Sequence, residues 1–191
     1  MRHAIPGAEA LTDRHPQDDD SAMIKQVTLR NLGGSRFLAR TGSGHEVLLD
    51  DGASDAGARP AELFIAALGG CTALDVASIL AKKRQSVTAY TVNVSGEQRD
   101  DPHPHVFVDI DIVHEVEGPE IDVEAVRRAI ELSATRYCQA TAMLSAGVAT
   151  IHHRYLVRSG GEERAGEVVV TGPHRDPDAA GDATPASATT A

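Results

Sequence analysis

Residues 63–81 read LFIAALGGCTALDVASILA, and this stretch decides the fold. It is apolar on nearly every side of a helix and carries one charge, Asp75. A membrane span needs about 20 predominantly apolar residues, so the length is marginal for crossing a bilayer. The charge beyond its middle, the Gly69-Gly70 pair and the amphipathic stretches on both sides favour a buried central helix instead. We therefore expect no membrane span.

The helix is expected to begin near Pro60 and to end near Lys83. Proline is tolerated at the first helical position, and cations at the other end complement the helix dipole. The paired glycines cost about 1 kcal/mol each relative to alanine. Such a cost is easiest to understand if another backbone or a ligand approaches closely at this point, directly before Cys71.

Strand-like runs surround this helix in the sequence. Before it, glycine breaks separate three short runs in the manner of an antiparallel meander. After it, apolar and polar residues alternate over 106–112, the period of a half-buried strand. A second helix is expected from Asp122 to Cys138, with a shorter one over 140–146. The remaining expected strands are 25–30, 36–40, 45–49, 87–94 and 148–157. This order of elements predicts an α+β domain.

The two ends differ from this core in composition. Residues 1–22 carry two basic residues against five acids, a charge of −3, and residues 159–191 carry two against six, a charge of −4. Low hydrophobicity with excess charge predicts disorder at both ends, with 168–170 as a candidate short edge strand. The expected domain therefore spans 23–158. The formal charge of −10 lies mostly in these two segments and indicates solubility rather than a cationic partner.

Composition also excludes several classes of protein. The net negative charge and an aromatic content of 3% argue against a nucleic-acid-binding surface, which needs clustered cations and stacking platforms. Two cysteines cannot form a disulfide-dense secreted scaffold. No apolar run of the kind found in signal peptides follows Arg2. We expect a cytoplasmic protein.

Both cysteines fall on expected helices, and three interpretations of them are open. Cys71 and Cys138 can each be a small buried hydrophobe. A metal site would draw on the five histidines between 103 and 153, but neither a CxxC nor an HExxH spacing is present, so we expect no metal and no cofactor. A redox pair is the sharper hypothesis.

A reactive cysteine needs a stabilised thiolate, usually beside a cation. Asp75 lies one helical turn from Cys71 and opposes its ionisation. An arginine from elsewhere would have to outweigh that charge. The candidates are Arg36, Arg40 and Arg136, and spacing alone does not choose among them.

Three segments resemble the OsmC/Ohr family: GGCTALDVASILAKKRQ at 69–85, SATRYCQATAML at 133–144 and IHHRYLV at 151–157. The resemblance covers roughly 25–157 and is closer to a branch of OsmC-like proteins apart from the best-studied peroxidases. It implies an α+β fold in which two chains intertwine as a homodimer. Antiparallel sheets then wrap around buried central helices, which accounts for a helix apolar on every side.

The resemblance also implies a chemistry. In the family peroxidases, the residue matching Cys71 attacks the O–O bond of an organic hydroperoxide and becomes a sulfenic acid. Cys138 would then resolve it as an intrachain disulfide, which an external thiol reduces. The family arginine that holds the thiolate is best matched by Arg36, which follows Gly33-Gly34-Ser35.

Two positions depart from the family pattern. The peroxidases carry a glutamate directly after the proline that opens the helix, whereas this chain has Ala61 there and Glu62 one residue later. One residue turns a helix by about 100°, so Glu62 points elsewhere than the family glutamate. Gln139 stands where the family has a proline after the second cysteine.

We therefore expect a thiol-dependent peroxidase acting through Cys71 and Cys138, with Arg36 and Glu62 as supporting residues. The rival expectation is a non-catalytic OsmC-like module that binds an apolar small molecule in the dimer pocket. A third, a purely structural stress protein, predicts neither peroxide turnover nor a ligand.

Overall fold

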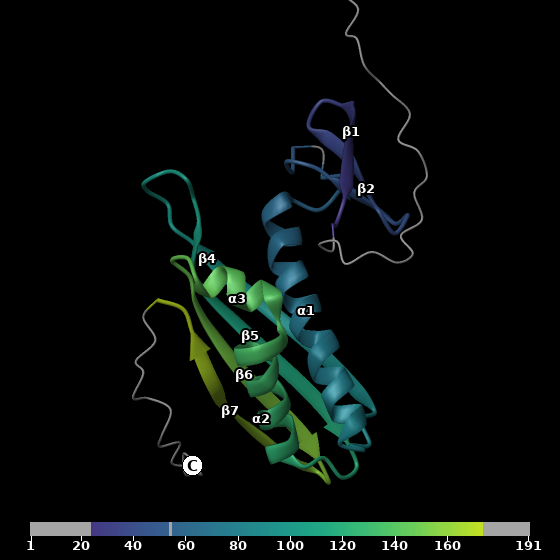
Figure 1. Cartoon of the computed structure of the whole chain (residues 1–191), viewed down its shortest axis with the longest axis vertical. Coiled ribbons are helices and arrows are strands. Elements are labelled where there is room, and N and C mark those ends of the chain that lie inside the picture. Colours follow the sequence, from purple (N-terminus) through teal and green to yellow (C-terminus); the bar gives the residue numbers. More distant parts are fainter. Residues whose placement is uncertain (1–23, 54, 174–191) are drawn as a thin grey trace, which may run out of the picture.

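A computed structural model describes residues 24–53 and 55–173 of the chain (Figure 1). Two sheets and a set of helices make up this part. In chain order the elements are β1 Val27–Gly33, β2 Arg36–Thr41, β3 Glu46–Leu49, α1 Pro60–Lys82, β4 Ala89–Gln98, β5 Phe107–Gly118, α2 Val123–Leu132, the π-helix η1 Ser133–Tyr137, α3 Gln139–Ser145, β6 Thr150–Ser159 and β7 Glu162–Thr171. The α+β class expected from the sequence is confirmed.

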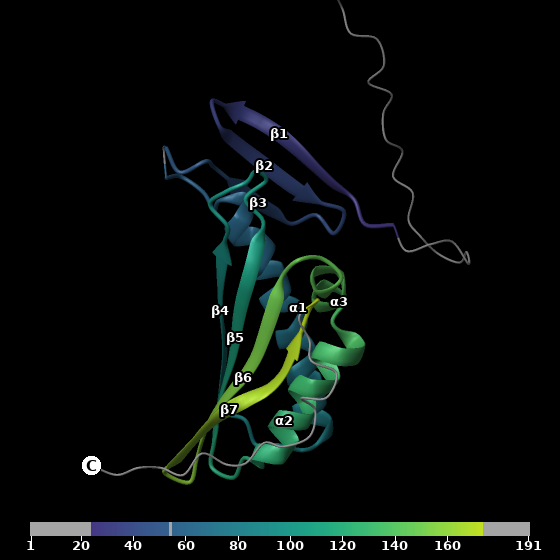
Figure 2. The same cartoon turned by 90° about the vertical axis from the view of Figure 1, so that its left-hand side faces the viewer.

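The first sheet is the expected meander, with β1, β2 and β3 paired antiparallel in that order. Gly33 and Gly34 make the first turn with φ of 106° and 60°, a backbone that favours glycine. This sheet lies beyond the N-terminal end of α1, apart from the larger sheet (Figures 1 and 2). Apolar residues on its strands stay exposed, Val27 at 56% and Leu29 at 55%.

The second sheet has the order β4-β5-β6-β7 and is mixed rather than wholly antiparallel. The outer pairs are antiparallel, but β5 and β6 run parallel. A parallel pair needs a long crossover, which α2, η1 and α3 supply. These helices and α1 lie on one face of the sheet (Figure 2).

The core lies between that face and the helices. The alternation expected at 106–112 is confirmed, because Ile110 and Ile112 are fully buried while Asp109 is exposed. It continues to Val116, which packs in one cluster with residues of α1 and α2. A second cluster includes Leu68 of α1 and Cys138.

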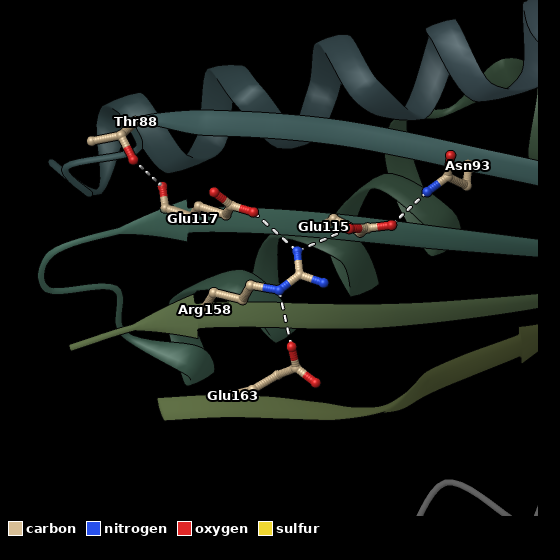
Figure 3. Close-up of polar contacts among 6 residues, drawn as sticks. All are labelled: Thr88, Asn93, Glu115, Glu117, Arg158 and Glu163. Atoms are coloured by element: carbon tan, nitrogen blue, oxygen red, sulfur yellow. Dashed lines mark hydrogen bonds and ion pairs between the residues drawn. The ribbon is translucent and has the colours of Figure 1, made fainter. Parts of the chain in front are cut away.

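The opposite face of the second sheet is charged. Arg158 of β6 donates hydrogen bonds to Glu115 and Glu117 of β5 and to Glu163 of β7, at 2.9 to 3.0 Å (Figure 3). These bonds, led by that to Glu115, raise the pKa of Arg158 above its ordinary value. Ion pairs of this kind are typical of a solvent-exposed face. The other face of the sheet is therefore the one that packs against the helices and forms the core.

The boundary expected at 158/159 is wrong. Strand β6 runs to Ser159, and the ten-residue strand β7 pairs with it up to Thr171. Gly160 and Gly161, with φ of 59° and 82°, make the turn of a hairpin rather than the start of a tail. The candidate edge strand at 168–170 is part of β7. The segment 1–22 and the remainder of the tail from 174 on lie outside the described residues.

Helix α1 buries one side only within the single chain. Leu68, Thr72 and Val76 face the sheet, while Leu74 is 75% and Phe64 51% exposed. By length and composition the helix could cross a membrane, and 28% of its most apolar stretch is buried. A core helix of a soluble protein meets the same criterion. The helix is therefore central, but one chain covers it incompletely.

Candidate thiol site

The structure brings the two cysteines together. Cys71 is half-buried on α1, and Cys138, 2% exposed, lies between η1 and α3. Their sulfur atoms and a carboxylate oxygen of Asp75 all lie within 4.8 Å of one another. Both cysteines are free thiols. A pair separated by 67 positions in the sequence thus forms one site.

A π-helical turn sets the position of Cys138. Its backbone N–H donates to the carbonyl of Ser133 at 2.9 Å, closing the wide turn of η1. Single π-turns of this type occur frequently at functional sites. Cys138 then caps α3, because its Sγ accepts a hydrogen bond from the Thr141 N–H at 3.4 Å. Burial, and secondarily Cys71, raises the pKa of the Cys138 thiol, although the bond from Thr141 acts in the opposite direction.

The structure explains why the first residue of the Gly69-Gly70 pair is a glycine. A Cβ at Gly69 would lie 2.7 Å from Cγ2 of Val94 on β4, so the missing side chain lets α1 lie close to the sheet. At Gly70 a Cβ would meet nothing within 4 Å. A close approach is thus found at the first of the two glycines, but it is made by a side chain and not by the backbone or ligand expected from the sequence.

A chain of polar side chains runs from Asp75 through the core. The Asp75 carboxylate is 2.9 Å from Ser133 Oγ, which is 3.0 Å from Thr72 Oγ1. Thr72 Oγ1 is 3.4 Å from His114 Nε2, and His114 Nδ1 is 2.7 Å from the Tyr90 hydroxyl. The three middle residues are fully buried.

The two titratable members at the far end of this chain are shifted by burial. Desolvation, with a smaller contribution from His153, lowers the pKa of His114 to about 3, so its imidazole is neutral. Burial, with a smaller contribution from Asp75, raises the pKa of Tyr90. Both groups are therefore uncharged at neutral pH.

Sequence reasoning missed this chain. His114 occupies an apolar position in the alternation of β5, and Thr72 and Ser133 interrupt the apolar faces of their helices. Polar residues at these apolar positions were the signal available in the sequence. Where their side chains meet, however, depends on how α1, β5 and η1 pack together.

The other expected site residues lie away from the cysteines in the single chain. Arg36 begins β2 in the first sheet and is exposed. Glu62 closes a capping box at the start of α1, accepting from the Arg59 backbone N–H at 2.9 Å and pairing with the Arg59 guanidinium at 3.4 Å. The structure therefore gives Glu62 a partner, Arg59, that sequence reasoning did not name.

Arg136 is the arginine candidate that shares a pocket with a cysteine. It lies in η1, with its guanidinium carbon 5.7 Å from the centre of the Tyr137 ring. Both residues, together with Cys138, line a pocket of about 490 Å³. Arg40 lies in β2 with Arg36.

A second pocket, of about 510 Å³, lies between α1 and β4. Its lining is mostly apolar, with Tyr90 and Glu62 as the polar exceptions. Because Tyr90 also ends the polar chain, that chain connects this pocket to the cysteine pair.

Cys71, Cys138 and Asp75 also form a set that could hold a metal ion. Two thiolates and a carboxylate suit Zn²⁺, and three protein ligands leave a fourth position open. The sequence predicted no metal because short ligand motifs are absent. That criterion does not detect this set, because the fold brings its members together from distant segments.

Comparison with protein families gives a match over most of the domain. A family model described as "OsmC-like protein" matches residues 52–166. Protein YhfA of Escherichia coli K12 is 38% identical over 132 residues, which are 69% of this chain and 97% of the relative.

Solved structures agree with this match. A hypothetical protein from Aquifex aeolicus is 28% identical with a TM-score of 0.65, over 72% of this chain and 98% of that one. An organic hydroperoxide resistance protein OsmC from Legionella pneumophila has a TM-score of 0.51 over 73% of this chain and 97% of that one. At 13% identity this last similarity shows the fold alone.

Proposed function

The chain belongs to the OsmC-like protein family, and from this premise we propose that it is a thiol-dependent peroxidase that reduces organic hydroperoxides. The observation that carries the proposal is the proximity of the Cys71 and Cys138 sulfurs, within 4.8 Å of each other. Thiols this close can form a disulfide with a small movement of either side chain. The description of a fold neighbour as an organic hydroperoxide resistance protein is consistent with this chemistry.

The reaction takes two steps at the pair. The Cys71 thiolate attacks the O–O bond, releasing the alcohol and leaving Cys71 as a sulfenic acid. Cys138 attacks that sulfur, water leaves, and a disulfide forms, which an external thiol of the cytoplasm reduces. The assignment of Cys71 to the first step agrees with its greater exposure.

The proposal includes a homodimer. The exposed side of α1, with Leu74, and the apolar residues of the first sheet, with Val27 and Leu29, leave large hydrophobic surfaces uncovered in one chain. A second copy that placed its first sheet on α1 would cover both. The same arrangement would carry Arg36 toward the partner's thiol, and Glu62 stays a supporting residue at the start of α1.

Peroxide consumption tests the proposal. With an organic hydroperoxide and excess dithiol, Cys71→Ser is expected to abolish turnover. Cys138→Ser, treated with one equivalent of hydroperoxide in the absence of dithiol, is expected to stop at one sulfenic acid per chain. Ser78→Ala, at an exposed position on the same helix, is the control. Unchanged peroxide consumption by the Cys71→Ser variant would contradict the proposal.

A second function has one observation in its favour. The apolar pocket of about 510 Å³ between α1 and β4 includes no cysteine, which suits a module that binds an apolar small molecule. Native mass spectrometry of the purified protein distinguishes the two functions. A retained small molecule with no peroxide turnover would favour the binding module.

A further inference from the structure

Ser133 links the polar chain to the carboxylate beside the cysteines. A serine hydroxyl has a single proton to donate, and a carboxylate only accepts. Ser133 Oγ is the donor toward Asp75 at 2.9 Å and also toward Thr72 Oγ1 at 3.0 Å, so the carboxylate and Thr72 share one proton. Thr72 Oγ1 continues the chain to His114 Nε2, and His114 Nδ1 continues it to the Tyr90 hydroxyl.

The hydrogen bond from Ser133 holds the Asp75 carboxylate in place and leaves its other lone pairs available to accept a proton. A carboxylate has about four lone-pair sites, and the serine uses one of them. One Asp75 oxygen and both Sγ atoms lie within 4.8 Å of one another, so the carboxylate stands beside both thiols. The titratable groups around the carboxylate are the two thiols, with Tyr90 and His114 farther along the chain.

We propose that Asp75 is the acid–base residue that takes the proton from the Cys138 thiol when the disulfide closes. The proposal rests on the peroxidase function proposed above. The Sγ–H bond of Cys138 breaks and its proton passes to Asp75, while the Cys138 sulfur attacks the sulfenic sulfur of Cys71. The S–O bond breaks, and the leaving hydroxide takes the proton from Asp75 as water. The Cys138 sulfur is oxidised and the sulfenic sulfur is reduced, so the step balances without a further reagent.

The burial of Cys138 calls for a base inside the site. This side chain is 2% exposed, so solvent water has little access to its thiol proton, and the thiolate rather than the thiol is the nucleophile. General acid–base assistance by a positioned side chain contributes about 10² to 10⁴ in rate. The proposed role also explains why a carboxylate lies beside Cys71, although its negative charge opposes ionisation of that thiol.

Rapid mixing with one equivalent of cumene hydroperoxide, acid quench and intact-mass measurement separates the two steps. In Asp75→Asn the sulfenic acid, 16 mass units heavier, is expected to form within a few-fold of the wild-type rate. Its conversion to the disulfide is expected to slow by about 100-fold or more, and the residual rate should rise about tenfold per pH unit as hydroxide replaces the base. Asp100→Asn, the same change at an exposed loop position, is the control.

Each outcome decides a different point. A wild-type protein that forms neither sulfenic acid nor disulfide would end the peroxidase proposal. Closure at the wild-type rate in Asp75→Asn would overturn the role of Asp75 alone, and so would loss of the sulfenic acid step. If Asp75→Asn does not fold, Ser133→Ala decides: about tenfold slower closure supports the proposal, and unchanged closure overturns it.

Discussion

His114 and His153 are buried histidines on neighbouring strands of the second sheet. Burial lowers the pKa of His114 to about 3 and that of His153 to about 4, from an ordinary value of 6.5. The unfolded chain therefore binds protons first as the pH falls. The stability associated with the neutral rings is fully present above pH 6.5 and is lost progressively as the pH falls, down to about 4 for His153 and about 3 for His114.

We expect the free energy of unfolding to fall by about 1.4 kcal/mol per pH unit for each histidine within that window. Urea unfolding at pH 7.5, 6.0 and 5.0 measures this dependence. His114→Gln is expected to be less stable at pH 7.5, because hydrogen bonds are lost, but to show a smaller slope. A stability independent of pH over this range would contradict the burial of neutral rings.

Elements with a local signal in the sequence were predictable. The length and apolar character of α1, the alternation on β5 and the glycine turns of the first sheet each depend on local chemistry. Strand β7 was predicted only as a candidate at 168–170, because its first residues, Glu162 to Arg164, are charged. They lie at the exposed end of a hairpin, where pairing with β6 rather than burial holds them.

The candidate site was predictable in part for the same reason. The two cysteines stand out by residue type, and their family match pairs them. Asp75 was noticed as a charge, but its link to Ser133, Thr72 and His114 depends on how helices pack on a sheet. Contacts between single polar residues from distant segments leave no periodic pattern in the sequence.

The packing of α1 on β4 makes a prediction at the scale of elements. Gly69→Ala would place a Cβ 2.7 Å from the stiff Val94 side chain, so overpacking of about 1 to 3 kcal/mol should exceed the helix-propensity gain of about 1 kcal/mol. Gly70→Ala, at an open position, is the matched control and should be neutral or stabilising. Urea midpoints compare the two; equal midpoints would show that α1 does not approach β4 this closely.

At the scale of the whole molecule, the uncovered apolar surfaces predict a second copy. Leu74, 75% exposed on the uncovered side of α1, should be buried between protomers. Leu74→Glu is therefore expected to shift the sedimenting species from twice the 20.1 kDa chain to a monomer. Val87→Glu, at an exposed position in the connection between α1 and β4, should leave the dimer intact. A wild-type protein that sediments as a monomer would refute the dimer.

The proposed placement of Arg36 can be tested in mixed dimers. If Arg36 serves the partner's Cys71, then Arg36→Ala and Cys71→Ser homodimers should each be inactive. Equal amounts refolded together should regain about one quarter of wild-type peroxidase activity, because half of the dimers are mixed and each mixed dimer has one complete site. No recovery in confirmed mixed dimers would place Arg36 away from the partner's thiol.

The central claim, that Cys71 and Cys138 form a redox pair, has one direct test. Reduced protein is treated with one equivalent of an organic hydroperoxide, digested and measured by mass spectrometry. We predict a rapid loss of two hydrogens that maps to a Cys71–Cys138 bridge within one chain. Persistence of both free thiols would contradict the claim and leave the apolar pocket as the functional site.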